Sequence, residues 1–263
     1  MSDSISSSPP NPSSAMLYFF ILTSIYFTVK YNTEPSKNKV YFGIYALLLI
    51  IGQFFINMSL TSSLCGTAQT GSAIFITVIP WFFIFGVLNL VLMAFPGWLV
   101  PFSNTFGYGV TKLLGINSLL NTIFKPKISK TDIKDTNIEL MAEALEHIYT
   151  DRSLLVNEIS QDNFDNFWSN MSPLFKSNVK GDSTLKNKLL GFIRLKDIVA
   201  EYIWFMLTGI LVTSVGYNYI VNSGCSQDVK EMQKRHKDYE TQEKTKLQEQ
   251  LNADPPRVYS SNE

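Results

Sequence analysis

Long apolar stretches alternate with charged ones along this chain, and the apolar stretches are long enough to form membrane-crossing helices. A helix needs roughly 20 apolar residues to cross a hydrocarbon core about 30 Å thick. Four segments meet this requirement, namely residues 15–31, 40–60, 72–95 and 199–221. Each is predicted to be helical because backbone groups in lipid must be paired within the segment, and Pro80 is expected to kink the third. The first segment is short, so an interfacial or buried helix remains its alternative.

The distribution of charge supports this division. From Val40 to Thr111 the chain contains no Asp, Glu, Lys or Arg, whereas charged residues make up about a quarter of an ordinary globular domain. Residues 112–196 and 226–263 carry many charges of both signs and are therefore assigned to water. The sequence predicts an all-α membrane protein with about four transmembrane helices, an interfacial helix, a small helical aqueous domain and a charged helical C-terminal tail.

Lysine and arginine near the ends of the spans predict the orientation. Lys37 and Lys39 lie between the first two spans, Lys30 lies at the end of the first, and Arg194 with Lys196 precedes the fourth. The opposite ends of the spans carry no basic residue until Lys230. Because basic residues concentrate on the cytosolic side, the loop 32–39 and the central domain are expected there, with both termini across the membrane.

The same topology brings both cysteines to the non-cytosolic side. Cys65 follows the second span and Cys225 follows the fourth. A disulfide between them is one interpretation, and two reduced cysteines are the other. Two cysteines do not supply the usual four ligands of a zinc site, and no cofactor or metal is expected.

Residues 96–125 combine loop formers with large aromatic side chains. Pro96 and Gly97 end the third span, after which the aromatic residues suit the headgroup region of a bilayer. The membrane-interface residues predicted here are Phe95, Trp98, Phe102, Phe106 and Tyr108. An in-plane interfacial helix or a re-entrant turn fits the apolar spacing, and a linker packed on the next domain is the alternative.

Three segments are expected to lie in water. Residues 1–14, rich in Ser and Pro, are predicted to form a disordered tail. Residues 126–198 are predicted to form a helical aqueous domain. A domain of this size has little hydrophobic core of its own, so we expect it to pack against the membrane or a partner. Residues 226–263 form a charged tail, read as a solvated helix or weak coiled coil that stops at Pro255 and Pro256.

The pattern offers little for catalysis. His147 has Glu143 four residues earlier on a helix, a common surface pairing, and no nucleophile elbow, phosphate-binding loop or HExxH helix is present. An enzyme is therefore not expected. A transporter or channel with a wet path near Gln53, Asn57 and Asn89 is the main alternative function, although such residues more often join helices. Lys+Arg and Asp+Glu are equal at 22 each, so no nucleic-acid partner is expected.

Residues 65–115 carry a distinctive series of motifs: a "CG…Q" loop, "PW..IFG" and "FPGW..PFSNTFGY". This block resembles a membrane protein of nucleocytoplasmic large DNA viruses, of the kind found in algal and mimivirus-like viruses. The resemblance implies a virion component in the internal membrane beneath the capsid, derived from the host endoplasmic reticulum during assembly. We therefore expect a structural protein that links the lipid bilayer to minor capsid or other virion proteins, and an oligomer is compatible with this role. The resemblance supplies no catalytic residue.

Overall fold

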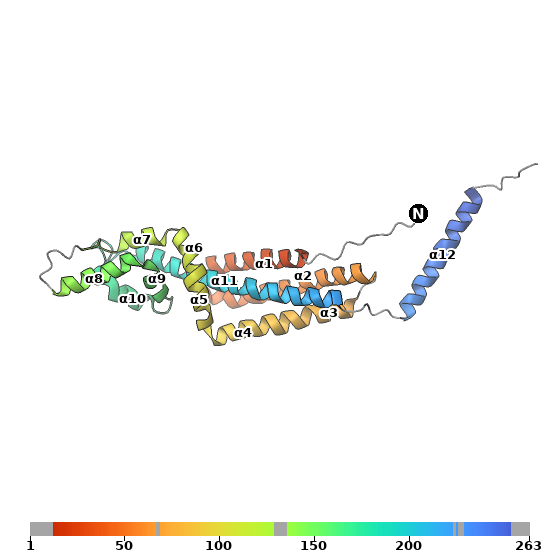
Figure 1. The fold of residues 1–263 in the computed structure, drawn as a ribbon, viewed down its shortest axis with the longest axis horizontal. Coiled ribbons are helices and arrows are strands. Elements are labelled where there is room, and N and C mark those ends of the chain that lie inside the picture. Colours follow the sequence, from red (N-terminus) through yellow and green to blue (C-terminus); the bar gives the residue numbers. More distant parts are fainter. Residues whose placement is uncertain (1–12, 67–68, 129–135, 223–224, 226–228, 254–263) are drawn as a thin grey trace, which may run out of the picture. The chain divides into compact units, whose positions relative to one another are not determined.

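The protein is an all-α membrane protein. A computed structural model describes residues 13–66, 69–128, 136–222, 225 and 229–253, and these residues contain no β-strand (Figure 1). The chain divides into two units, residues 1–222 and 223–263, which are described separately. Of the predicted N-terminal tail, residues 1–12 lie outside the described residues, and Ser13 already begins the first helix.

Four helices of the first unit are long and apolar enough to cross a membrane, as predicted. They are α1 (Ser13–Asn32), α2 (Asn38–Cys65), the segment from α3 (Thr70–Val78) to α4 (Gly86–Ala94), and α11 (Ser183–Asn222). A short 3-10 turn, η1 (Pro35–Lys37), joins α1 to α2. The first segment is thus a full 20-residue helix, the length needed to span a bilayer.

The third spanning segment changes its helical geometry at its proline. Between α3 and α4 lies η2 (Ile79–Phe85), a π-helical stretch that begins at the residue before Pro80. Proline has no N–H to donate to the preceding turn, and a wider turn is a common way for a helix to accommodate this loss. At Pro80, where a kink was expected, the structure has a π-helical stretch, and the kink itself stays a prediction.

The inside of the bundle is largely aromatic. Phe19, Tyr26 and Phe205 belong to one buried cluster contributed by α1, α2, η2 and α11. Close approach depends on glycine, because a Cβ on Gly209 would lie 2.0 Å from Cζ of Phe19. Large apolar side chains on the outer faces remain exposed, as expected where the neighbour is lipid.

After α4 the chain turns across the bundle. This crossing segment consists of η3 (Pro96–Leu99), α5 (Val100–Phe102), η4 (Ser103–Gly107) and α6 (Tyr108–Leu113). It packs mainly against α11, and in Figure 1 α5 runs steeply across the direction of the bundle helices. The predicted interfacial segment is thus helical over most of its first half.

Four short helices and a 3-10 turn of the first unit form a head at one end of the bundle. They are α7 (Ile116–Ile123), α8 (Thr136–Thr150), α9 (Arg152–Glu158), α10 (Phe164–Met171) and the turn η6 (Ser172–Leu174). Their core includes Leu120, Phe124, Leu145, Trp168 and Phe175. Residues 116–124, assigned by sequence to the interfacial segment, therefore belong to the head, because their apolar face packs against α8, α10 and α11.

Helix α11 joins the two cores. Its N-terminal part supplies Leu189 and Ile193 to the head, and its C-terminal part supplies Phe205 and Val212 to the bundle. The predicted division between residues 198 and 199 falls inside this uninterrupted helix of 40 residues. At 1.5 Å per residue, α11 is about 60 Å long, twice the thickness of a hydrocarbon core.

The second unit contains a single described helix, α12 (Val229–Ala253), whose described side chains are exposed. Mean hydropathy along it is low and charges of both signs alternate. A solvated helix was predicted here, whereas Pro255 and Pro256, expected to stop it, lie outside the described residues.

Candidate functional site

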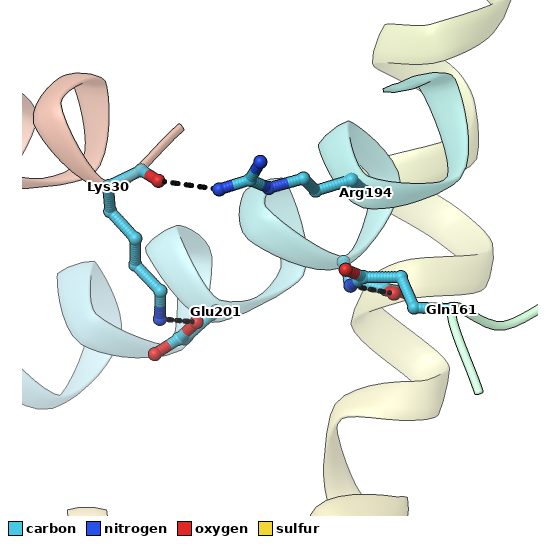
Figure 2. A network of polar contacts seen from close by, with 5 residues as sticks. Lys30, Gln161, Arg194 and Glu201 are labelled. Atoms are coloured by element: carbon cyan, nitrogen blue, oxygen red, sulfur yellow. Dashed lines mark hydrogen bonds and ion pairs between the residues drawn. The ribbon is translucent and has the colours of Figure 1, made fainter. Parts of the chain in front are cut away.

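Charged side chains concentrate where the bundle meets the head. Lys30, in the last turn of α1, forms an ion pair with Glu201 of α11, and the two side chains are 16% and 23% exposed. Figure 2 shows Lys30 reaching across from α1 to Glu201. Charged groups at the end of a membrane helix are costly unless they are paired. The pair therefore fixes the end of α1 against α11.

Arg194 makes a second connection between the same helices. Its guanidinium donates a hydrogen bond to the carbonyl oxygen of Lys30 at 3.1 Å (Figure 2) and another to the carbonyl oxygen of Thr33 at 2.6 Å. The last carbonyls of a helix have no partner within the helix, so a cationic donor placed there both satisfies them and matches the helix dipole. Arg194 thereby caps the C-terminal end of α1 and connects it to the part of α11 that enters the head.

Asp197 connects α11 to two other segments. One carboxylate oxygen accepts a hydrogen bond from Ser103 of the crossing segment at 3.2 Å, and the other accepts one from Gln161 of the head at 3.0 Å. Gly107 allows this approach, because a Cβ there would lie 2.3 Å from the carbonyl oxygen of Lys196. The "SNTFG" sequence is thus a close-packing surface against α11.

Lys196 is buried although it is a basic residue, and burial lowers the pKa of its amine. It is 2% exposed, and its Nζ donates hydrogen bonds to the carbonyl oxygens of Val156 at 2.8 Å and Ile159 at 3.0 Å. These carbonyls lie at the end of α9, where helical partners are lacking. Lys196 therefore holds α9 against α11. We call residues 194–201 of α11, together with the side chains and carbonyls they bind, the joint between the bundle and the head.

The five aromatic residues predicted at the membrane interface separate into two groups. Phe95, Trp98 and Phe106 are exposed, with Phe95 and Trp98 stacked at 6.0 Å between ring centroids. Phe102 packs edge-on against Trp204 of α11, and Tyr108 packs on the core of the head. The position of these side chains in a bilayer stays a prediction, but their contacts show that Phe102 and Tyr108 also connect the crossing segment to its neighbours.

The polar residues proposed for a wet path make contacts inside the bundle. Gln53 donates to the carbonyl oxygen of Ala15 at 3.0 Å, and Asn57 donates to Thr77 Oγ1 at the same distance. Asn89 donates to the carbonyl oxygen of Phe85 at 2.7 Å. Gln53 and Asn57 thus join neighbouring helices, as polar residues in membrane bundles commonly do.

Three cavities lie among the described residues of the first unit, and two of them border the joint. One of about 210 Å³ has Lys30, Glu201 and Asn89 in its wall. A second, of about 470 Å³, is an apolar groove between α2 and the η2–α4 segment. The third, of about 300 Å³, lies between the crossing segment and the head and is lined by Ser103 and Asp197 among others.

The other residues singled out by sequence lie away from this joint. His147 and Glu143 are both exposed on α8, with 4.0 Å between Nε2 and Oε1. Within the described residues no group of three or more His, Cys, Asp or Glu side chains could hold a metal. Cys65 ends α2 in the first unit and Cys225 belongs to the second, so their pairing stays a prediction, although neither is a free thiol.

Sequence reasoning noticed part of this joint and missed the rest. Lys30, Arg194 and Lys196 were visible as basic residues near the ends of apolar stretches, which is the signal that finds them. Ser103 and Gln161 carried no such signal, since their role depends on a carboxylate distant in sequence. Comparison with known proteins adds no further site residues: no family model, no curated protein and no solved structure matches the chain.

Proposed function

We propose that this chain is a structural membrane protein that holds its head in a fixed position at the bilayer surface, where other proteins bind. The observation that carries this proposal is the single helix α11, which supplies residues to the bundle core and to the head core. A flexible linker would leave the head free to move, whereas a continuous helix built into both cores restrains it.

The joint supports the same role. Arg194, Lys196 and Asp197 connect α11 to the end of α1, to α9 and to the crossing segment within about one helical turn. Such a set of contacts resists both tilting and rotation of the head relative to the bundle. A scaffold needs this rigidity.

The more specific proposal places the protein in a virion. It rests on the resemblance of residues 65–115 to a membrane protein of large DNA viruses. In that setting the chain would lie in the internal membrane and link it to minor capsid proteins. The motif "FPGW..PFSNTFGY" covers η3, α5 and η4 and ends at the first residue of α6, so this part of the resemblance falls on the segment that connects the bundle to the head.

Site-specific photocrosslinking tests this proposal. A photoreactive residue at Leu154, an exposed apolar residue of α9, is expected to capture a protein partner in native membranes or virions. The matched control is Leu47, equally exposed on the outer face of α2 but predicted to face lipid. If Leu154 captures no more protein than Leu47 does, the scaffold proposal fails, and absence of the chain from purified virions would refute its viral form.

A further inference from the structure

We propose that the bundle binds one glycerophospholipid beside the joint, with the headgroup in the 210 Å³ cavity and one acyl chain in the 470 Å³ groove. The lipid would carry a phosphate and a hydrogen-bond donor in its headgroup, as phosphatidylethanolamine does. This site does not depend on the scaffold role. The inference follows from four observations on the two cavities.

The smaller cavity has a polar wall at the end of the bundle nearest the head. It lies among α1, α2, α4 and α11 and is lined by Lys30, Lys39, Asn38, Asn89 and Glu201, together with apolar side chains. Two lysines against one glutamate leave a positive excess. Basic pockets between membrane helices on the cytosolic side, the side predicted for this end, favour phosphate-bearing headgroups.

Asn89 adds a specific requirement to this wall. It is 5% exposed, and its Nδ2 donates a hydrogen bond to the carbonyl oxygen of Phe85. Its Oδ1 is buried and accepts no hydrogen bond from the residues that the structure describes. An unsatisfied buried acceptor is costly, so a ligand that brings an N–H or O–H donor is favoured over one that does not.

The larger cavity continues from the smaller one. Phe42, Asn89 and Met93 line both, and the rest of the groove wall is apolar, with Leu49, Ile50, Phe82 and Leu90 among its residues. Asn89 precedes the end of α4 by five residues, which places it about 7.5 Å along the helix. The polar cavity therefore lies toward the membrane surface and the groove extends toward the bilayer centre, which is the order of headgroup and acyl chain.

Small residues keep the groove open. Gly86 and Ala46 face it from opposite walls, and a Cβ added to Gly86 would meet no atom within 4 Å. The space at Gly86 is therefore available to a ligand. Because Gly86 lines the groove, a leucine there is expected to take up part of its space.

The acyl-chain part of the proposal is tested by filling the groove. The full chain is purified in mild detergent, loaded with phosphatidylethanolamine, and examined by native mass spectrometry. Gly86→Leu is expected to reduce lipid retention by about tenfold or more. Gly43→Leu is the matched control. Gly43 lies on α2 of the same bundle, and a Cβ there would also meet no atom within 4 Å, but Gly43 lines neither cavity.

The headgroup part is tested with lipids that differ by one feature. Phosphatidylcholine has the same phosphate but a quaternary ammonium without N–H, so it is expected to be retained less than phosphatidylethanolamine. Lys39→Ala should weaken retention of both lipids. Lys37→Ala, a neighbouring exposed lysine outside the cavity wall, should leave it unchanged.

Defined outcomes would overturn the inference. Equal retention by Gly86→Leu and Gly43→Leu would show that the acyl chain does not occupy the groove. Equal retention of phosphatidylethanolamine and phosphatidylcholine would show that Asn89 does not accept a hydrogen bond from the headgroup, and the proposed headgroup site would be wrong. If Gly86→Leu instead abolishes dimers detected by crosslinking, the groove receives a helix from a second copy and the lipid proposal is wrong.

Discussion

At the scale of single residues, the joint depends on polar groups that are individually unfavourable in their surroundings. Lys196 and the Lys30–Glu201 pair each remove charge from water, and each is compensated by defined hydrogen bonds or an opposite charge. Breaking one partner of such an arrangement leaves the other uncompensated, which costs more than the intact interaction contributes. These residues therefore fix geometry more than they add stability.

Glu201→Gln is expected to destabilise the protein by leaving Lys30 without its counter-ion, by roughly 1–3 kcal/mol for a partly buried pair. Thermal unfolding in detergent measures the effect. The double variant Lys30→Met with Glu201→Leu should recover most of the loss, because it removes both charges. A double variant less stable than Glu201→Gln would contradict this account.

Gly107→Ala should lower the unfolding temperature, since its Cβ would collide with the backbone of Lys196 and force α11 away from the crossing segment. A loss of about 1–3 kcal/mol is typical of such overpacking. Gly109→Ala is the control, because its Cβ would meet no atom within 4 Å, and alanine favours the helix. Similar unfolding temperatures for the two variants would show that the close approach at Gly107 does not matter.

At the scale of elements, helix ends explain how the head is assembled. Asp151 precedes α9 and accepts a hydrogen bond from the backbone N–H of Ser153 at 2.9 Å, which satisfies a free donor of the first turn. Lys196 satisfies carbonyls at the other end of the same helix. This seven-residue helix would be unstable alone, and both of its ends are held.

Asp151→Ala should lower the stability of the head at neutral pH, and the loss should shrink in acid. Hydrogen bonds from the Ser153 side chain and backbone lower the pKa of the Asp151 carboxyl below its usual value. A lowered pKa stabilises the folded state above the unfolded-state pKa of about 4, and the contribution disappears as pH falls through the folded value. Denaturation followed by circular dichroism against pH measures this. Asp162→Ala, at an exposed turn, is the control, and a pH-independent difference between Asp151→Ala and the wild type would contradict the capping role.

At the scale of the whole molecule, the four spanning helices determine which segments share a side of the membrane. α1 and α11 are tied together at the end that carries Lys30, Arg194 and Glu201. The head is attached at this same end through the crossing segment. Lys and Arg also concentrate there, so the cytosolic side of the head stays a prediction from the charge distribution alone.

This topology predicts a labelling pattern for single cysteines in a background lacking Cys65 and Cys225. A membrane-impermeant thiol reagent should reach Lys37→Cys and Lys130→Cys from one side and Ser6→Cys and Ser260→Cys from the other. Detergent-permeabilised membranes, in which all four should react, provide the control. If Ser6→Cys reacts together with Lys130→Cys, α1 does not cross the bilayer.

The sequence predicted the elements better than their grouping. The four spans follow from uninterrupted apolar length, which no aqueous helix of this size tolerates. Leu120 and Phe124 were placed at the interface because an apolar helical face suits lipid and a protein core equally well. The boundary before residue 199 was placed where the charged stretch 112–196 gives way to an apolar run. Lys196 and Asp197, at the end of that stretch, are satisfied by partners far away in sequence, so the helix continues through them.

Helix α11 also has a consequence for the order of biogenesis. It is synthesised after the first three spans and after α7 to α10, yet both cores need its side chains. A nascent chain that ends before residue 183 has an open bundle in the membrane and an open core in the head, with apolar surfaces exposed in each. Translation of this one helix closes both at once, so insertion and folding are completed in the same step, and the interval before it is when the chain most needs protection from aggregation.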